Sequence, residues 1–261
     1  MIYDQALLIL SGAFVGFFIG LTGVGGGSLM TPILLLFGFP AQIAVGTDLL
    51  YAAITKAGGI VSHHKQSTIQ WKIVGSLACG SIPGSILTIL FIDAYFTDAY
   101  QYQPILTTAL GFMLFLTSLV ILFHRRIQRR SATPSSMSQI IARHSTPITS
   151  LMGLGLGILV TLSSVGAGAF GAAILLMIYT RTKSIVIVGT DIAHAVPLTL
   201  VAGIGHLYLG HVDFSLLAAL VMGSLPAIVV GTRLGQKIPD RIMRPLLGSS
   251  LLAISLKLVM S

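Results

Sequence analysis

The chain has 261 residues, of which 54% are hydrophobic and 8% are charged, and its mean hydropathy is +0.95. Soluble globular domains carry about 25% charged residues, so this composition excludes an ordinary soluble domain and indicates an integral membrane protein. The net charge of +8 does not indicate a nucleic-acid partner, because most basic residues lie in short loops between apolar runs. Cytoplasmic loops of membrane proteins have this composition.

Ten apolar runs, taken in chain order, predict an all-α membrane protein. The 29 glycines and the length of the runs favour close-packed helices over the alternating strands of a membrane barrel, which are about ten residues long. The runs are 5–21, 28–38, 43–61, 73–92 and 104–123 in the first half, and 148–162, 169–179, 185–207, 214–232 and 246–260 in the second. Runs 28–38 and 169–179 are too short to cross a bilayer, which requires about 20 residues.

The two halves of the chain repeat the same landmarks. Residues 22–27 (TGVGGG) are followed by residues 45–48 (VGTD), and residues 163–168 (SSVGAG) are followed by residues 188–191 (VGTD). Further matches 143 positions apart are His63 with His206 and residues 80–83 (GSIP) with 223–226 (GSLP). A glycine-broken apolar segment that occurs once in each half is typical of a duplicated membrane transporter.

The glycine breaks and the charges together predict that the second repeat is inverted. Each short run follows a glycine break and is interpreted as half of a re-entrant helix hairpin, so a hairpin plus three transmembrane helices brings each half to the opposite side. The predicted parts are a first repeat (1–123), a basic cytoplasmic linker (124–146) and a second repeat (147–261), with both termini outside. One face then collects basic residues, as expected of the cytoplasmic side: Lys65, Lys72, Arg125, Arg126, Arg129, Arg130, Arg143, Arg181, Lys183, Arg233, Lys237, Arg241 and Arg244.

The glycine turns predict an anion site at the membrane midplane. Glycines let backbone N–H groups point into a cavity, and the short helices starting near Ser28 and Ala169 direct their positive N-terminal ends at it. Inverted repeats place two such turns face to face, where transporters of this construction hold substrate. The alternative is that the glycines only permit close helix packing. The predicted substrate-binding residues are Thr22, Gly25, Gly26, Gly27, Ser28, Ser163, Ser164, Gly166, Gly168 and Lys56.

Lys56 is the basic residue that lies deep in a first-half span, and it is expected to attract the anion, to pair with an acid or to reach the headgroups. Asp48, Asp191, His194 and His206 are candidates for proton coupling, because ionisable groups within a membrane are costly and imidazole titrates near neutrality. The alternative is structural: each aspartate caps the start of its own helix, and the histidines only support packing. No residue is assigned to catalysis, to a metal or to a cofactor.

Several of these motifs resemble the sulfite exporter TauE/SafE family of membrane permeases over essentially the whole chain. They are residues 16–27 (GFFIGLTGVGGG), Pro32, residues 45–48 (VGTD) and residues 80–84 (GSIPG). The second glycine block departs from the first, with Ser164 and Ala167 where the first has glycines. The resemblance implies transport of small anions in a prokaryotic inner membrane, typically sulfur oxyanions or organosulfonates such as sulfite, thiosulfate or sulfoacetate.

The sequence therefore predicts a secondary anion transporter that works by alternating access. An anion channel with a glycine-lined constriction is one alternative. An intramembrane enzyme is another, although no local motif fixes Ser28 or Ser164 as a nucleophile beside a base. Substrate identity, transport direction, coupling ion and oligomeric state stay open at this point.

Overall fold

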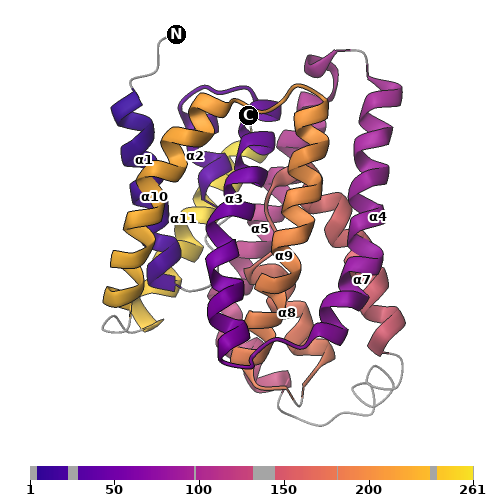
Figure 1. The fold of residues 1–261 in the computed structure, drawn as a ribbon, viewed down its shortest axis with the longest axis vertical. Helices are drawn as coiled ribbons and strands as arrows, with labels where there is room; N and C mark the ends of the chain where they lie inside the picture. The colour runs from indigo at the N-terminus through magenta and orange to yellow at the C-terminus, as the bar shows by residue number, and fades with distance from the viewer. Residues whose placement is uncertain are drawn as a thin grey trace.

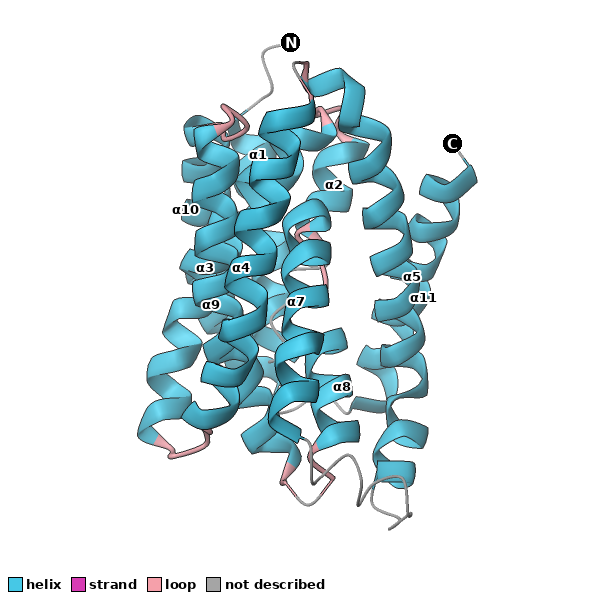
Figure 2. Ribbon diagram, turned by 90° about the vertical axis from the view of Figure 1, so that its right-hand side faces the viewer, coloured by secondary structure: helices cyan, strands magenta, loops and turns pink. Residues whose placement is uncertain are grey.

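The computed structural model describes residues 5–22, 29–96, 98–131, 145–180, 182–235 and 240–260, and these ranges form ten helices without a strand (Figures 1 and 2). Each helix coincides with one of the predicted apolar runs. The helices are α1 (Gln5–Thr22), α2 (Met30–Leu36), α3 (Ala41–Lys65), α4 (Trp71–Tyr95), α5 (Ala99–Ser131), α7 (Ser145–Ser163), α8 (Ala169–Ile178), α9 (Ser184–Tyr208), α10 (Phe214–Gly235) and α11 (Asp240–Met260).

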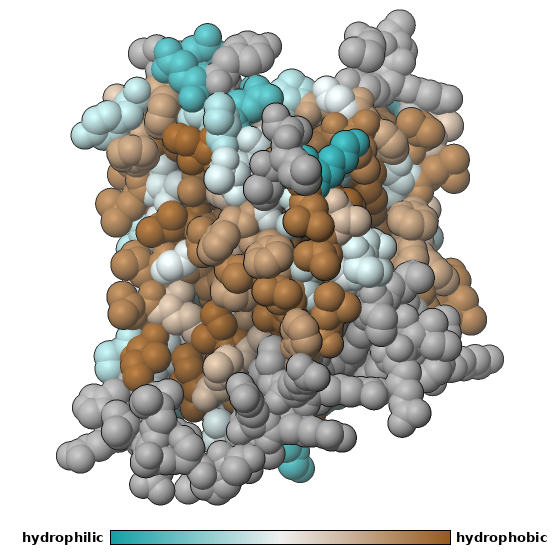
Figure 3. Space-filling view, turned by 180° about the vertical axis from the view of Figure 1, so that it is seen from behind, coloured by the Kyte–Doolittle hydropathy of each residue, from teal (hydrophilic) through white to brown (hydrophobic). Residues whose placement is uncertain are grey.

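The lengths and surface of these helices suit a bilayer. In the described residues, five helices are long and apolar enough to cross a membrane, namely α4, α5, α7, α9 and α10. Helices α2 and α8 have 7 and 10 residues, too few to span it. Apolar side chains cover the middle of the face shown in Figure 3, while hydrophilic atoms gather at its upper end. The prediction of an all-helical membrane protein is confirmed.

Helix direction alternates along the chain, and the two halves start at opposite ends of the molecule. Helix α1 begins at the upper end in Figure 1 and runs downwards, whereas α7 begins at the lower end and runs upwards. Helix α2 lies in the upper half and α8 in the lower half (Figure 2). The loops after α3 and α8 lie at the lower end, and the loops after α4 and α9 lie at the upper end.

Small residues allow pairs of helices to touch through their backbones. Gly12 and Gly16 of α1 lie against the backbone of Leu220 and Ser224 on α10. Helices α4 and α7 pair in the same way, because Gly80 and Gly84 of α4 approach the α7 backbone and Gly153 and Gly157 of α7 approach the α4 backbone. Glycine at such positions permits the close approach that membrane helices use where no hydrophobic force drives them together.

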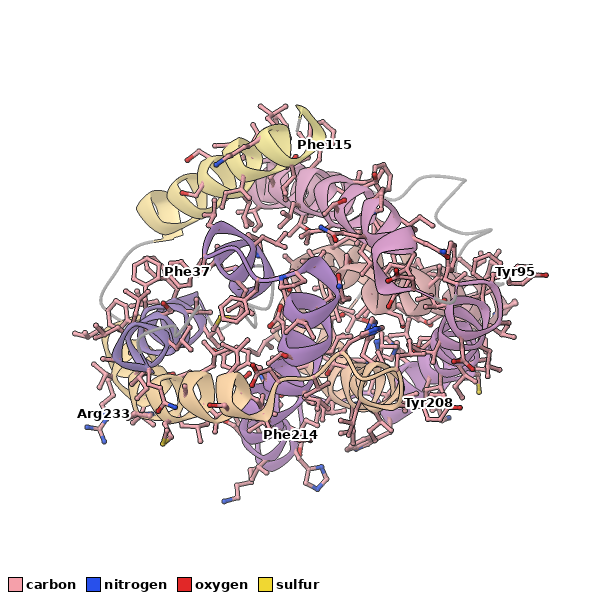
Figure 4. The ribbon with its side chains drawn as sticks, turned by 90° about the horizontal axis from the view of Figure 1, so that it is seen from above. Phe37, Tyr95, Phe115, Tyr208, Phe214 and Arg233 are labelled. Carbon is pink, nitrogen blue, oxygen red and sulfur yellow. The ribbon has the colours of Figure 1, made fainter. Side chains whose placement is uncertain are left out.

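The paired helices surround a central pair, α3 and α9. Viewed from above, α3 occupies the middle of the bundle, and the labelled side chains of Tyr95, Tyr208 and Phe214 point outwards from its rim (Figure 4). One apolar core joins α1, α2, α3 and α10, and a second joins α4, α7, α8 and α9. Helices α5 and α11 pack together along one edge. Among the described residues, the central pair carries the buried charged side chains, Asp48, Lys56 and Asp191.

Each half makes the same contacts with the other half: a contact from a first-half residue to a second-half residue is repeated from the matching second-half residue to the matching first-half residue. The backbone N–H of Gln70 donates to the Thr190 hydroxyl over 3.0 Å, and the N–H of Asp213 donates to the Thr47 hydroxyl over 3.1 Å. The members of each matched pair lie 143 positions apart in the sequence. Two close approaches repeat likewise: Gly46 with His206 and His211, and Gly189 with His63 and Thr68.

A short glycine-containing turn separates α7 from α8. Gly166 and Gly168 adopt φ values of 121° and 141°, a region that residues with a side chain rarely enter. The N–H groups of Gly171 and Ala172 donate back to the carbonyls of Gly166 and Gly168, both over 2.9 Å. The corresponding first turn, residues 23–28, lies outside the described residues. Helix α5 continues to Ser131, which extends it into the predicted linker.

Candidate functional site

Buried ionisable side chains gather where α3 and α9 pack against each other. Asp48 and Lys56 come from α3, Asp191 and His194 come from α9, and none of the four is more than 5% exposed. Lys56 is within electrostatic range of both carboxylates and of the imidazole. Placing charged groups inside a membrane protein is costly, so such a cluster indicates function.

Asp48 is held at the start of α2. Its Oδ2 accepts a hydrogen bond from the backbone N–H of Thr31 over 3.2 Å and a second from the Thr31 hydroxyl. The first N–H groups of a helix lack partners within that helix, so this carboxylate caps α2 from outside. Asp48 does not cap its own helix, because α3 begins at Ala41 and has no acid in its first turn.

Replacing Thr31 with valine removes the hydroxyl donor but keeps the size of the side chain. We expect the free energy of unfolding to fall by about 1–3 kcal/mol, because the buried Asp48 carboxylate loses one of its hydrogen-bond donors. The measurement is the apparent melting temperature of the purified protein in detergent. Thr88→Val is the control, since the buried Thr88 hydroxyl donates only to the Gly84 carbonyl of its own helix. Equal melting temperatures for the two variants would contradict the cap.

Asp191 lies at the start of α8, as Asp48 lies at the start of α2, but among the described residues it has no hydrogen bonds like those from Thr31. One of its carboxylate oxygens, Oδ1, lies against Gly171 in the first turn of α8, and no hydrogen bond reaches this buried atom among the described residues. Gly171 offers no hydroxyl where Thr31 provides one to Asp48. The position predicted for a substrate anion, the start of a short helix, is therefore taken in this structure by the protein's own carboxylates.

The turn between α7 and α8 forms one side of the cluster. The Ser163 hydroxyl donates to the Leu159 carbonyl over 2.6 Å and accepts from the N–H of Val165 over 3.2 Å, so it stabilises the turn. Ser164 adopts a φ of 57°. Its buried hydroxyl lies beside the Asp48 carboxylate but makes no hydrogen bond within the described ranges.

Lys56 connects the halves of the chain. Its ammonium group donates to the carbonyl of Ala167, within the turn, over 2.9 Å. An ammonium group has three N–H donors, so this bond leaves donors for another acceptor. The deep position predicted for Lys56 is thus accompanied by a specific contact with the second half.

His194 contacts a serine on α4. The Ser81 hydroxyl and His194 Nε2 lie 2.7 Å apart, and Nδ1 of the imidazole has no partner in the described part of the chain. A hydrolytic serine needs a base that a third group orients, and none of the described residues orients His194 in that way. The residues 143 positions away, Ser224 and Tyr51, also lie side by side.

His206 belongs to a different cluster, near the upper end of the bundle. It follows His194 by twelve positions on α9, which corresponds to roughly 18 Å. Its Nε2 donates to the Thr161 carbonyl over 2.9 Å, and the Tyr102 hydroxyl lies 2.7 Å from Nε2 of His211. Burial lowers the pKa of His211, which lies in the loop after α9, so this imidazole is neutral near pH 7.

The structure thus brings together five of the predicted site residues and leaves others apart or undescribed. Gly25, Gly26, Gly27 and Ser28 lie outside the described residues, as does the side chain of Thr22. Sequence reasoning missed Ser81, although the repeated GSIP motif marked it, and missed Thr31 as the partner of Asp48, although Thr31 follows the glycine break. The residues in the cluster are Asp48, Lys56, Ser164, Asp191 and His194.

Comparison with known proteins gives a consistent family. The family model of the sulfite exporter TauE/SafE family matches residues 8–258. The probable membrane transporter protein YjnA of Bacillus subtilis is 38% identical over 252 residues, which cover 97% of this chain and 98% of that protein. The probable membrane transporter protein YdhB of the same organism is 31% identical over 246 residues, covering 91% of this chain and 93% of the relative.

A more distant relative comes from an archaeon. The probable membrane transporter protein MJ0441 of Methanocaldococcus jannaschii is 26% identical over 261 residues, covering 94% of this chain and 91% of that protein. No solved structure matches the chain significantly. The family model and the two Bacillus relatives each extend over almost the whole chain, and the structure has the apolar helices of a membrane protein. The chain therefore belongs to the sulfite exporter TauE/SafE family of membrane transporters.

Proposed function

We propose that the protein is a secondary transporter that carries a small anion by alternating access, with the anion held in the cluster of Asp48, Lys56, Ser164, Asp191 and His194. The observation that carries this proposal is Lys56, a buried cation whose ammonium reaches the turn before α8. The Ser164 hydroxyl, which lies beside Asp48 and has no hydrogen-bond partner among the described residues, is a second donor. Buried donors without partners are what an anion needs for binding inside a membrane protein.

The proposed architecture is two inverted repeats, each with a re-entrant helix pair. Three features support it: the exchange of partners between matched contacts, the opposite starting ends of α1 and α7, and the shortness of α2 and α8. Alternating access then arises when one repeat moves against the other around the fixed site. The lower end, with Lys65, Lys72, Lys183 and Arg233, is assigned to the cytoplasm by the positive-inside rule.

The substrate class we favour is a sulfur oxyanion or an organosulfonate, such as sulfite, thiosulfate or sulfoacetate, carried across a prokaryotic inner membrane. The name of the matching family, sulfite exporter, supports this choice. Proton coupling is part of the proposal, because Asp48, Asp191, His194 and His206 are all buried at the centre or along one side of the bundle. Counterflow exchange distinguishes this carrier from an anion channel. Unlabelled substrate inside a vesicle accelerates the uptake of labelled substrate by a carrier but not by a channel.

Anion-dependent stabilisation of the purified protein tests the site. A ligand that binds only the folded state raises its apparent melting temperature. With sulfite, thiosulfate, sulfate, sulfoacetate, taurine and chloride as the panel, we expect at least one sulfur anion to raise it and chloride to leave it unchanged. Ser164→Ala is expected to weaken the shift, whereas Ser62→Ala, at an exposed position of α3, is expected to keep it. A flat response to every anion would contradict the proposed site.

A further inference from the structure

We propose that the Asp191 carboxylate and the substrate anion compete for one position, at the start of α8 beside Lys56, so that Asp191 takes up a proton whenever the anion binds. Asp48, its counterpart in the first half, is a structural cap that stays ionised throughout. This inference rests on the proposed function, and it assigns the coupling step to one of the four candidate residues. It also predicts that the anion and one proton cross the membrane together.

The first step of the argument is the difference between the two aspartates. Asp48 accepts two hydrogen bonds from Thr31, both directed at Oδ2, and it cannot leave α2 without breaking both. Oδ1 of both acids lacks a hydrogen bond from the described residues, but Asp191, which is 1% exposed and lies against Gly171, has no counterpart of the two bonds that hold Oδ2 of Asp48. Hydrogen bonds to a carboxylate favour its charged form, so the fixed acid is Asp48 and the replaceable one is Asp191.

The second step is the balance of charge. With both acids ionised, Asp48 and Asp191 carry two negative charges against the single positive charge of Lys56, so the cluster already has an excess of negative charge. A bound anion would add further negative charge in a buried site, where such repulsion is weakly screened. A proton on Asp191 removes one of the negative charges. Lys56 and the positive end of α8 are then free for the incoming anion.

The third step is to identify what else faces Asp191. Helix α9 packs against α3, α4, α7 and α8. The charged group that faces Asp191 is Lys56 on α3, which also faces Asp48, and His63 of α3 lies beside Gly189. Helices α7 and α8 contain no ionisable residue, and α4 contributes Ser81, which contacts His194 rather than Asp191.

His194 does not take the proton in place of Asp191. It lies one turn along α9, and a proton on its ring would create a second positive charge beside Lys56 in a buried site. A proton on Asp191 instead neutralises a charge. During transport the proton comes from the water on the side where the anion enters, and it converts the Asp191 carboxylate to the carboxylic acid. As the anion leaves on the other side, the proton returns to water and the ionised Asp191 pairs with Lys56 again.

Proton uptake on anion binding tests this inference directly. Wild-type protein in weakly buffered detergent receives thiosulfate or sulfoacetate, whose charges stay fixed near neutral pH, while a pH indicator and calorimetry record protons and bound anion. We expect about one proton taken up per bound anion, and an affinity that rises about tenfold for each unit by which the pH falls. Asp191→Asn is expected to bind the anion without proton uptake and without dependence on pH.

Two variants of the first half provide the comparison. Asp48→Asn and the milder Thr31→Val are both expected to lower the melting temperature while the surviving folded protein still takes up a proton with the anion. Proton uptake that persists in Asp191→Asn, or disappears in Thr31→Val, would overturn the assignment. Anion binding without proton uptake in the wild type would overturn the inference and leave the proposed function standing. If neither anion binds the wild type at any pH, the proposed function fails, and the inference fails with it.

Discussion

Lys56→Met is expected to abolish anion transport and to destabilise the protein by about 3–5 kcal/mol, the range found when one partner of a buried charge pair is removed. Methionine preserves the length of the apolar stem but loses the positive charge and the hydrogen bond to the Ala167 carbonyl. The buried carboxylates of Asp48 and Asp191 then have no opposing charge. Uptake into proteoliposomes and the apparent melting temperature in detergent measure the two effects.

The pH dependence of this variant separates charge from packing. Protonated carboxyl groups need no counter-charge, so the destabilisation caused by Lys56→Met is expected to shrink as the pH falls. Lys72→Met is the matched control, because Lys72 is exposed near the start of α4, and it is expected to behave like the wild type at every pH. A Lys56→Met protein with wild-type stability and transport would contradict the role of this residue.

Gly157→Leu is expected to separate α7 from α4 and to cost about 1–3 kcal/mol or more, as overpacking of a close-packed interior does. The first carbon of any side chain at this position would overlap the backbone of Ser81. Because Ser81 holds His194, we also expect weaker anion binding. Melting temperature and the anion-dependent shift measure the two consequences.

The same helix supplies the control for this substitution. Gly155 lies two positions earlier on α7, and a side-chain carbon built there meets nothing within 4 Å. Gly155→Leu is therefore expected to change stability little, since it faces away from α4. If both substitutions destabilise equally, the cost comes from replacing glycine in a membrane helix and not from the contact with Ser81.

The positions of the helices were predictable because each depends on a local property of the chain. A bilayer requires a continuous apolar run, and all ten runs in the sequence correspond to helices. The glycine break at residues 166–168 was also predictable, since the φ values of Gly166 and Gly168, 121° and 141°, are ones that residues with a side chain rarely adopt. The end of α2 has a similar cause, because Gly38 adopts a φ of 85°. The N–H groups of Gly38 and Phe39 then donate to carbonyl groups in the last turn of the helix.

The partners of the site residues were not predictable, because they lie far apart in the sequence. Lys56 and Ala167 are separated by 111 positions, and Ser81 and His194 by 113. Helical periodicity shows which residues share a face of one helix, but it does not show which helix lies opposite. The structure places the Asp48 carboxylate at the start of α2, where Thr31 lies 17 residues earlier in the chain, and not at the start of its own helix.

The sequence by itself determined the class of the protein, its ten apolar helices, its internal repetition and its family resemblance, because composition, run length and motif spacing are properties of the chain alone. The tertiary structure decided that Thr31 holds Oδ2 of Asp48 while no described residue holds Asp191 in the same way. It also decided that Lys56 reaches the turn of the other half, and that His206 lies apart from the cluster. These properties follow from packing between α3, α9 and the turn before α8, where residues remote in sequence meet in a buried space that no local pattern specifies.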